Sequence, residues 1–208
     1  MNEPEICPNS PDQSGTHKDN HNRGHLFVVS APSGAGKTTL CGAVLKHFNA
    51  MIYSVSYTTR SPRKGEKDAV DYHFISPVEF KNGIIDQKWA EWAEVHGHYY
   101  GTSAEFLDNG LSAGKDILAD IDVQGTIQIL ARHPDCISIF IAPPSLETLR
   151  HRLESRGLDS AAVIEQRLHN AKDEMAQKDI YRHVIVNDQL REAKKQLISL
   201  VQKYRRSS

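Results

Sequence analysis

A glycine-rich segment between residues 31 and 39 carries the clearest chemistry in the sequence. Its residues match the phosphate-loop (Walker A) pattern: Ala31-Pro32-Ser33-Gly34-Ala35-Gly36-Lys37-Thr38-Thr39. Glycines let backbone N–H groups turn toward a polyphosphate, and a helix that starts directly afterwards adds partial positive charge. In this pattern Lys37 reaches the outer phosphates and the Thr38 hydroxyl binds Mg²⁺. The segment predicts a site for a nucleoside triphosphate with Mg²⁺, but it does not say which reaction follows.

One position departs from the pattern, because Ala31 stands where the first glycine is expected. An alanine fits there if φ is negative, since a positive φ strains a residue that has a Cβ atom. The alternative interpretation is a glycine-rich turn that contains a lysine by accident. We favour the phosphate loop because the segment follows a buried-strand pattern and precedes a helical one, which is the context the motif requires.

Two arginines, Arg60 and Arg63, lie three residues apart in the turn-rich segment 54–63. The guanidinium fork can bind phosphate oxygens through two parallel hydrogen bonds, which a lysine cannot do. An enzyme that only hydrolyses a nucleoside triphosphate needs one nucleotide site, so these arginines suggest a second phosphorylated ligand. A solvated basic surface is the alternative, and for an arginine pair in isolation it is the more common one.

The elements that must position these residues follow an α/β order. Four short apolar runs are typical of strands buried on both faces: 26–30, 117–119, 137–141 and 184–186. Two segments show apolar residues at helical spacing, the first directly after the phosphate loop (Leu40, Val44, Leu45, Phe48) and the second near the C-terminus (Leu190, Ala193, Leu197, Leu200, Val201, Tyr204). This alternation predicts a three-layer α/β fold with a mostly parallel sheet.

Three further segments stand apart from this alternation. Residues 1–23 are polar with a single large apolar residue, so we expect a disordered tail before a domain over 24–208. The stretch of about 54–103 has short polar-alternating runs and a helix start in which Ser76 is the N-cap, Pro77 opens the first turn and Glu79 completes a capping box. We interpret it as an inserted lobe. An arginine-rich stretch of about 147–168, broken by Gly157, is predicted to be a mobile lid.

Composition and charge argue against several classes of protein. The 208 residues are 39% hydrophobic and 25% charged, as in an ordinary soluble globule, and the net charge of -1 argues against a general nucleic-acid binder. No apolar run is long enough to span a membrane, and no signal peptide is visible. The three cysteines Cys7, Cys41 and Cys136 form no CxxC pair, which suits a cytoplasmic location. Eleven histidines include no zinc-type spacing, His96 and His98 being only two apart.

Six motifs together resemble the guanylate kinase family, in that family's order. They read SAPSGAGKTT, SVSYTTRSPRKGE, VDYHF, EWAEVHGHYYGTS, DIDVQG and FIAPPS, and the likeness extends from residue 24 to about 205. The resemblance implies a P-loop NTPase fold with a core, a GMP-binding lobe and a lid. It also implies transfer of the ATP γ-phosphate to GMP, giving GDP and ADP, with Mg²⁺.

The resemblance also implies roles for individual residues. ATP would be bound by residues 31–39, the phosphate of GMP by Arg60, Arg63, Tyr72 and Tyr100, and guanine by Ser56, Glu91, Thr102 and Asp122. Catalysis would involve five cationic side chains: Lys37, Arg60, Arg152, Arg156 and Arg167. Mg²⁺ would be held by Thr38 directly and by Asp120 through water. Asn187 and Asp188 would lie near the adenine.

The chemistry of guanine agrees with the role of Glu91. Guanine presents two adjacent donors, N1–H and N2–H₂, that one carboxylate can accept, whereas adenine offers an acceptor at N1. For several of these residues an ordinary structural role is the alternative interpretation. Glu91 by itself is typical of a surface helical glutamate, Asp120 of an aspartate satisfied at a strand end, and the lid arginines of helix-face charges. Tyr99 and Tyr100 are compatible with aromatic packing, and we assign only Tyr100 to phosphate.

A phosphate monoester acceptor is already anionic, so the expected mechanism is positioning and charge neutralisation without a general base. Three alternatives remain in view: another nucleoside monophosphate kinase, a non-catalytic guanylate-kinase-like binding module, and a regulatory GTPase. Glu91 and Asp122 argue against the first. A phosphate loop that keeps Gly34, Gly36, Lys37 and Thr38 argues against the second, and the lack of an NKxD-type loop argues against the third. The sequence leaves open whether dGMP is also used and whether the chain is a monomer or a homo-oligomer.

Overall fold

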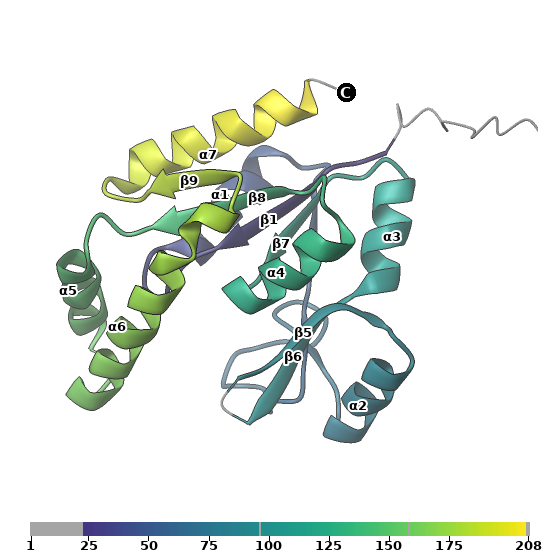
Figure 1. The fold of residues 1–208 in the computed structure, drawn as a ribbon, viewed down its shortest axis with the longest axis horizontal. Coiled ribbons are helices and arrows are strands. Elements are labelled where there is room, and N and C mark those ends of the chain that lie inside the picture. The colour runs from purple at the N-terminus through teal and green to yellow at the C-terminus, as the bar shows by residue number, and fades with distance from the viewer. Residues whose placement is uncertain (1–22, 96, 158, 207–208) are drawn as a thin grey trace, which may run out of the picture.

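The computed structural model describes residues 23–95, 97–157 and 159–206 (Figure 1). The expected tail, Cys7 and His96 therefore lie outside the described residues, apart from Arg23 at the end of the tail. The centre of the fold is a five-stranded sheet in the order β2-β7-β1-β8-β9. All four neighbouring pairs are parallel. The strands are β1 (Leu26–Ser30), β2 (Ile52–Ser54), β7 (Ile117–Asp120), β8 (Ile137–Ala142) and β9 (His183–Val186).

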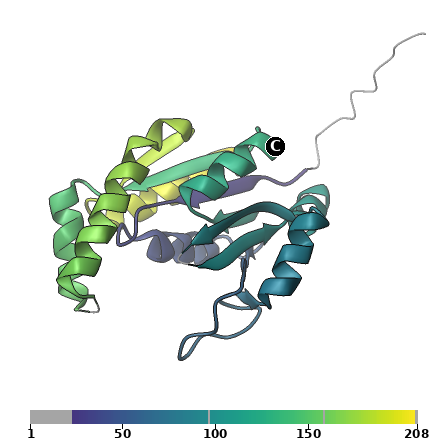
Figure 2. The ribbon, with the colours of Figure 1, turned by 60° about the horizontal axis from the view of Figure 1, so that its bottom comes forward.

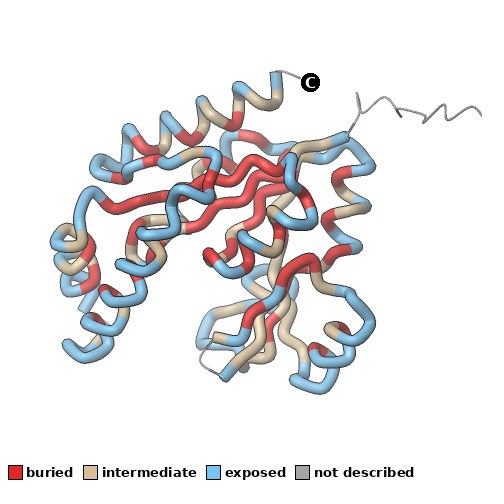
Figure 3. The backbone as a smooth tube through the Cα atoms, in the orientation of Figure 1, coloured by how far each residue is buried: buried red, intermediate tan, exposed pale blue. Residues whose placement is uncertain are grey.

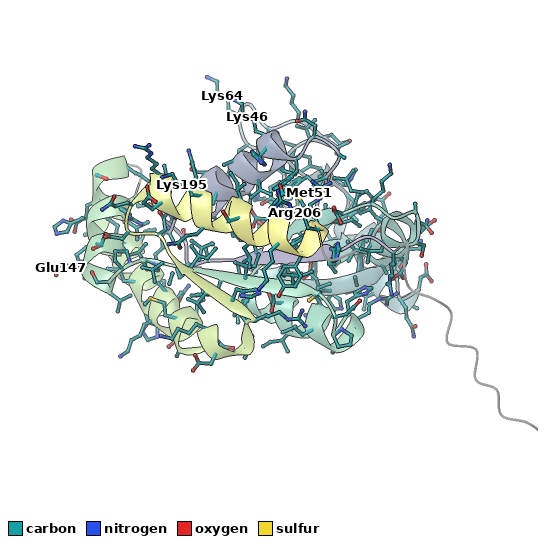
Figure 4. The ribbon with its side chains drawn as sticks, turned by 90° about the horizontal axis from the view of Figure 1, so that it is seen from above. Lys46, Met51, Lys64, Glu147, Lys195 and Arg206 are labelled. Atoms are coloured by element: carbon teal, nitrogen blue, oxygen red, sulfur yellow. The ribbon has the colours of Figure 1, made fainter. Side chains whose placement is uncertain are left out.

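Helices cover both faces of this sheet, which confirms the predicted three-layer α/β fold. Alternate residues of β1 point to opposite faces. Phe27 and Val29 pack in one cluster with α1 (Lys37–His47) and α7 (Leu190–Arg205). Leu26 and Val28 pack in another with α3 (Ala104–Ser112) and α4 (Val123–Arg132). Figure 3 shows the strands as the buried centre of the molecule. In Figure 4, α7 lies across the sheet, with Lys195 and Arg206 toward its two ends.

A second, smaller sheet is formed by residues between β2 and β7. Its strands are β3 (Tyr57–Thr58), β4 (His73–Phe74), β5 (Trp89–Val95) and β6 (His98–Ser103), in the order β4-β3-β6-β5. Helix α2 (Pro77–Ile85) packs on it through Phe80, whose ring stacks on Trp89 and Tyr99. The predicted capping box is confirmed, because Glu79 N donates to Ser76 Oγ over 3.1 Å and Ser76 N donates to Glu79 Oε2 over 2.8 Å.

The arginine-rich segment forms a helical hairpin of α5 (Leu146–Arg156) and α6 (Ala161–Ala176). Gly157 ends α5 in the left-handed conformation, with φ of 63°. Leucines and Ile164 pack between the two helices as a small core of their own. The hairpin and the small sheet both lie below the central sheet in Figure 1, and Figure 2 shows them apart from each other. A 3₁₀ turn (Lys178–Ile180) then leads into β9. Among the helices that the structure describes, none has the length and apolar character that crossing a membrane requires.

Candidate active site

The glycine-rich segment occupies the turn between β1 and α1, at the carboxyl edge of the central sheet. Gly34 and Gly36 adopt φ of 93° and 98°, which only glycine tolerates without strain. Ala31 is not in this region, because the only non-glycine residues with positive φ in the described chain are Ala69 and Gln87. The alanine in place of the first glycine is therefore accommodated, as expected. The loop presents its backbone at the N-terminus of an eleven-residue helix.

Lys37, the first residue of α1, pairs with Asp120 at the end of the neighbouring strand β7. Lys37 Nζ lies 2.5 Å from Asp120 Oδ1 and donates a second hydrogen bond to the carbonyl oxygen of Ile121 over 3.3 Å. Burial by itself lowers the pKa of Lys37, but the charge and hydrogen bond of Asp120 outweigh it and the pKa is raised. The site thus holds a charged ammonium beside a carboxylate.

Asn187, after β9, binds the backbone of the phosphate loop through its side chain. Its side-chain Nδ2 donates to the carbonyl oxygen of Ala35 over 2.7 Å, and the residue is buried. A methyl group at Gly36 would lie 2.5 Å from that Nδ2 atom, so this position requires glycine for close approach as well as for its φ. The structure therefore gives Asn187 a contact with the loop, which the sequence had suggested only as proximity to adenine.

A cavity of about 630 Å³ opens between the central and small sheets. The core contributes Lys37, Thr38, Asp120 and Asp122 to its wall. The small sheet and the segments beside it contribute four of the eight predicted GMP ligands, namely Ser56, Tyr72, Glu91 and Tyr100, whereas Arg60, Arg63 and Thr102 do not line the cavity. Sequence reasoning missed four other polar wall residues: Cys41, Tyr53, Glu66 and Asp71. Only the fold brings them here.

Glu91 lies on β5, directly across from Thr102 on β6. Thr102 Oγ1 donates to Glu91 Oε1 over 2.6 Å, and Glu91 is only 5% exposed. Glu91 is therefore a buried strand residue, and its interpretation as a surface helical glutamate is wrong. Burial raises the pKa of Glu91 to about 7; the hydrogen bond from Thr102 acts against that shift, and Asp122 adds to it. A methyl group at Gly125 would lie 2.4 Å from Glu91 Oε2, so α4 approaches this carboxylate closely.

Asp122 is the N-cap of α4, the helix that approaches Glu91. Its Oδ1 atom accepts a hydrogen bond from Gly125 N over 2.7 Å. One of its oxygens is thus engaged by the helix, and the residue still lines the cavity beside Glu91. A carboxylate that caps a helix has a fixed orientation, which suits a group that must meet a ligand at a defined angle.

Arg60 is held by Glu66 through two parallel hydrogen bonds. Nη1 lies 3.0 Å from Glu66 Oε2, and Nη2 lies 2.9 Å from Oε1. The guanidinium also lies over the ring of Tyr72, 5.4 Å from its centroid, and Tyr72 meets Tyr100 edge-on at 5.9 Å. Arg63 is exposed, and its backbone N–H donates to Glu66. Glu66 therefore organises the predicted phosphate-binding turn.

The three predicted lid arginines do not converge in this structure. Arg167 reaches the phosphate loop, where Nη1 donates to Ser33 Oγ over 3.2 Å, and it also pairs with Asp159. Arg152 Nη2 instead donates to the backbone carbonyl oxygens of Asn187 and Asp188, over 2.8 and 3.2 Å. Arg156 is exposed at the end of α5. Only Arg167 touches the predicted triphosphate site.

Comparison with known proteins gives a consistent result. The family model described as guanylate kinase matches residues 23–204. The guanylate kinase of Dechloromonas aromatica is 48% identical over 178 residues, 86% of this chain and 88% of that protein. The guanylate kinase of Geobacter sulfurreducens is 47% identical over the same shares of the two chains. A crystal structure of guanylate kinase from Anaplasma phagocytophilum superimposes with a TM-score of 0.73 at 32% identity, covering 88% of this chain and 87% of that one. By sequence and by fold, the chain belongs to the guanylate kinase family.

Proposed function

We propose that this chain transfers the γ-phosphate of ATP to GMP, giving ADP and GDP. One observation carries the proposal: residues of the phosphate-loop helix and the buried carboxylate of Glu91 line the same cavity. A triphosphate site and an acceptor for guanine's two donors, opening onto one space, are what such a transfer needs. The guanylate kinases that the chain resembles support the same reaction.

ATP would be bound by residues 31–39, with Lys37 turning from Asp120 to the outer phosphates. Thr38 and Asp120 would hold Mg²⁺, the hydroxyl directly and the carboxylate through water. This donor set fits the ion, because Mg²⁺ prefers oxygen ligands and keeps places for substrate phosphates and water. When bound, Mg²⁺ neutralises charge on the β- and γ-phosphates. We expect Arg167 to remain at the loop during the reaction, while Arg152 and Arg156 reach the phosphates only after a movement of the hairpin.

GMP would lie between the small sheet and the core. Glu91 and Thr102, with Ser56 and Asp122, would read the guanine ring. Tyr72 and Tyr100, with Arg60 and Arg63, would bind its phosphate. Because Glu66 uses both terminal nitrogens of Arg60, we expect phosphate to bind at the remaining donors of this cluster or to displace Glu66 in part. The same pocket would accept dGMP, since no assigned residue acts on the 2′-hydroxyl.

Catalysis would then depend on positioning rather than on a base. The acceptor phosphate is anionic, so it can attack in line once Lys37 and the arginines neutralise the transferring group. Water must be excluded to prevent hydrolysis of ATP. We therefore propose that residues of about 54–103 act as a GMP-binding lobe and residues of about 147–168 as a lid. Cys41 and Cys136 are buried free thiols, which suits a cytoplasmic location because thiols stay reduced there.

A coupled assay tests this function. Purified protein with ATP and Mg²⁺ is given GMP, AMP, CMP or UMP, and ADP formation is followed. We expect turnover with GMP at least about a hundredfold above the others, since a site built to pair two donors rejects bases that lack them. Equal turnover of AMP would contradict the guanine assignment. No turnover of any of the four by folded protein would favour a non-catalytic binding module instead.

A further inference from the structure

Tyr53 lies on the edge strand β2 and forms part of the cavity wall. Its neighbour Ile52 packs on the cluster beneath α3 and α4, so alternation along the strand points Tyr53 to the opposite face, toward α1. Tyr53 pairs with Leu118 of β7, which belongs to the α1 and α7 cluster. Asp120 follows Leu118 by two residues on the same face. The phenol is therefore placed at the edge where Lys37 meets Asp120.

The hydroxyl of Tyr53 is an uncharged hydrogen-bond donor that has no acceptor among the described residues. Burial, and then the negative charge of Asp120, raise the pKa of Tyr53, so the phenol stays protonated at neutral pH. Within the described part of the chain, no carbonyl or side chain accepts a hydrogen bond from it. The other groups that act electrostatically on it include Asp71 and Tyr72, and the Arg60 guanidinium lies over the Tyr72 ring.

The charges of the cavity wall explain why such a donor matters. One lysine faces five carboxylates there: Glu66, Asp71, Glu91, Asp120 and Asp122. The nearby guanidinium of Arg60 is already committed to Glu66. A nucleoside monophosphate that binds in this acidic cavity needs hydrogen-bond donors that are not already bound to another acceptor. A hydroxyl that donates to a charged phosphate oxygen makes a charge-assisted hydrogen bond, about twice as strong as a neutral one.

We propose that Tyr53 is a further phosphate-binding residue, whose hydroxyl donates a hydrogen bond to a phosphoryl oxygen of GMP alongside Tyr72 and Tyr100. The inference rests on the proposed function and extends it to a residue that the sequence did not single out. It places a donor of the core against the phosphate of GMP, whereas Tyr100 lies on β6 of the small sheet and Tyr72 directly precedes β4. The phosphate of GMP would thus contact both the core and the small-sheet region of the protein.

Calorimetric titration of Tyr53→Phe tests this contact. The ligands are GMP, dGMP and guanosine, each without ATP. We expect the Kd for GMP and for dGMP to rise by the same factor, about tenfold, since a hydrogen bond to a charged group is lost. The Kd for guanosine should not change, because it has no phosphate. Under turnover, KM for GMP should rise and KM for ATP should stay the same. Tyr57→Phe is the matched control, since Tyr57 lines a separate cavity with Trp89.

Each other pattern overturns the inference. An equal loss for guanosine would mean that Tyr53 only shapes the pocket, and a loss for GMP without one for dGMP would place its hydroxyl on the ribose. An unchanged Kd for GMP with an altered Mg²⁺ requirement would mean that it orients Asp120. The proposed function is judged separately, by turnover of GMP in the parent and by weaker GMP binding in Tyr72→Phe. If both hold while Tyr53→Phe binds GMP normally, only the role of Tyr53 falls.

Discussion

Thr102 donates its hydroxyl hydrogen to Glu91 across the β5–β6 pair, over 2.6 Å, and thereby fixes a buried carboxylate that faces the cavity. This bond uses one lone pair of Oε1 and aims the carboxylate, leaving acceptor positions for a ligand. An acceptor held in this way selects for a base with two neighbouring donors.

Glu91→Gln tests that selection. The variant keeps the shape of the side chain but puts an N–H where an acceptor stood, so a guanine N–H loses its partner at a cost of about 1–3 kcal/mol. We expect KM for GMP to rise at least about tenfold with a lower kcat, while KM for ATP stays constant. Inosine monophosphate, which lacks the N2 amine, should lose less. Glu94→Gln, an exposed position on the same strand, is the control. Equal losses for both nucleotides would refute the assignment.

The protonation of Glu91 predicts how base binding depends on pH. Its pKa in the free protein is raised to about 7 by burial, and only the carboxylate can accept both guanine donors. The Kd for guanosine should therefore level off near pH 8, and it should rise toward tenfold per pH unit below pH 6. Guanosine is chosen because GMP has a phosphate that titrates in the same range. In Glu91→Gln this dependence should vanish. A flat profile in the parent protein would contradict an ionised Glu91 in the complex.

The raised pKa of Glu91 also predicts how the free energy of unfolding depends on pH. Because the folded pKa lies above the unfolded value, the ionised carboxylate opposes folding at high pH, and this penalty is relieved as pH falls from about 7 toward the unfolded pKa. In urea titrations, the free energy of unfolding of Glu91→Gln relative to that of the parent protein should therefore be higher at pH 8 than at pH 5. A difference between the two proteins that is the same at both pH values would contradict this linkage.

Lys37→Met should leave a folded protein that transfers phosphate at least about a hundredfold more slowly. The lysine is the charge that the phosphate loop provides for the transferring group, and loss of a preorganised donor of this kind has an effect of that size. The measurement is kcat at saturating ATP and GMP, with circular dichroism to verify folding. Lys46→Met is the control, because Lys46 lies on the exposed last turn of the same helix (Figure 4). Near-normal turnover would exclude Lys37 from catalysis.

Asp116 fastens the C-terminal helix to the sheet, and its removal should destabilise the fold. It accepts hydrogen bonds from His25 N over 3.0 Å and from Arg205 Nε over 2.6 Å. Burial by itself raises the pKa of Asp116, but these bonds outweigh it and the pKa is lowered. Its contribution is therefore present above the ordinary carboxyl pKa and is lost as pH falls through the lowered value. Asp116→Asn should reduce the free energy of unfolding in urea at pH 7 by about 1–3 kcal/mol. The exposed Asp135→Asn should change it little.

Binding of both substrates should make the molecule more compact. The small sheet and the α5–α6 hairpin lie apart in Figure 2, Arg152 donates to the carbonyl oxygens of Asn187 and Asp188, and Arg156 is exposed. Transfer without loss of ATP to water requires them to close. Small-angle scattering with GMP and a non-hydrolysable ATP analogue together should give a smaller radius of gyration than either ligand by itself. Unchanged curves at saturation would exclude the closing lobe and lid.

The sequence predicted best those features that depend on neighbours along the chain. The strand–turn–helix setting of the glycine-rich segment, the capping box at Ser76 and four strands of the central sheet are set by local spacing and apolar patterning, and the structure confirms them. The strand β2 has only three residues, Ile52–Ser54, and its pattern is too short to stand out from the inserted stretch. The wall residue Tyr53 was missed for the same reason.

Partners that meet only through the tertiary fold could not be predicted. Glu66 is six residues from Arg60, and no spacing rule says that a turn will join them through two hydrogen bonds. Arg152 binds carbonyl oxygens 35 and 36 residues away, on a turn whose position depends on β9. The burial of Glu91 requires α4 to pack against β5, so its motif indicated a role in binding while its local sequence resembled an exposed helix.

The contact between the α5–α6 hairpin and the phosphate loop has a mechanical consequence. Leu149 and Leu153 are fully buried between α5 and α6, and the same two side chains would lie 3.1 and 2.9 Å from a methyl group at Gly34. Since these leucines pack between the two helices, we expect α5 and α6 to move together rather than separately. Since they also lie against Gly34, we expect the position of the hairpin and the conformation of the glycine-rich turn to be coupled.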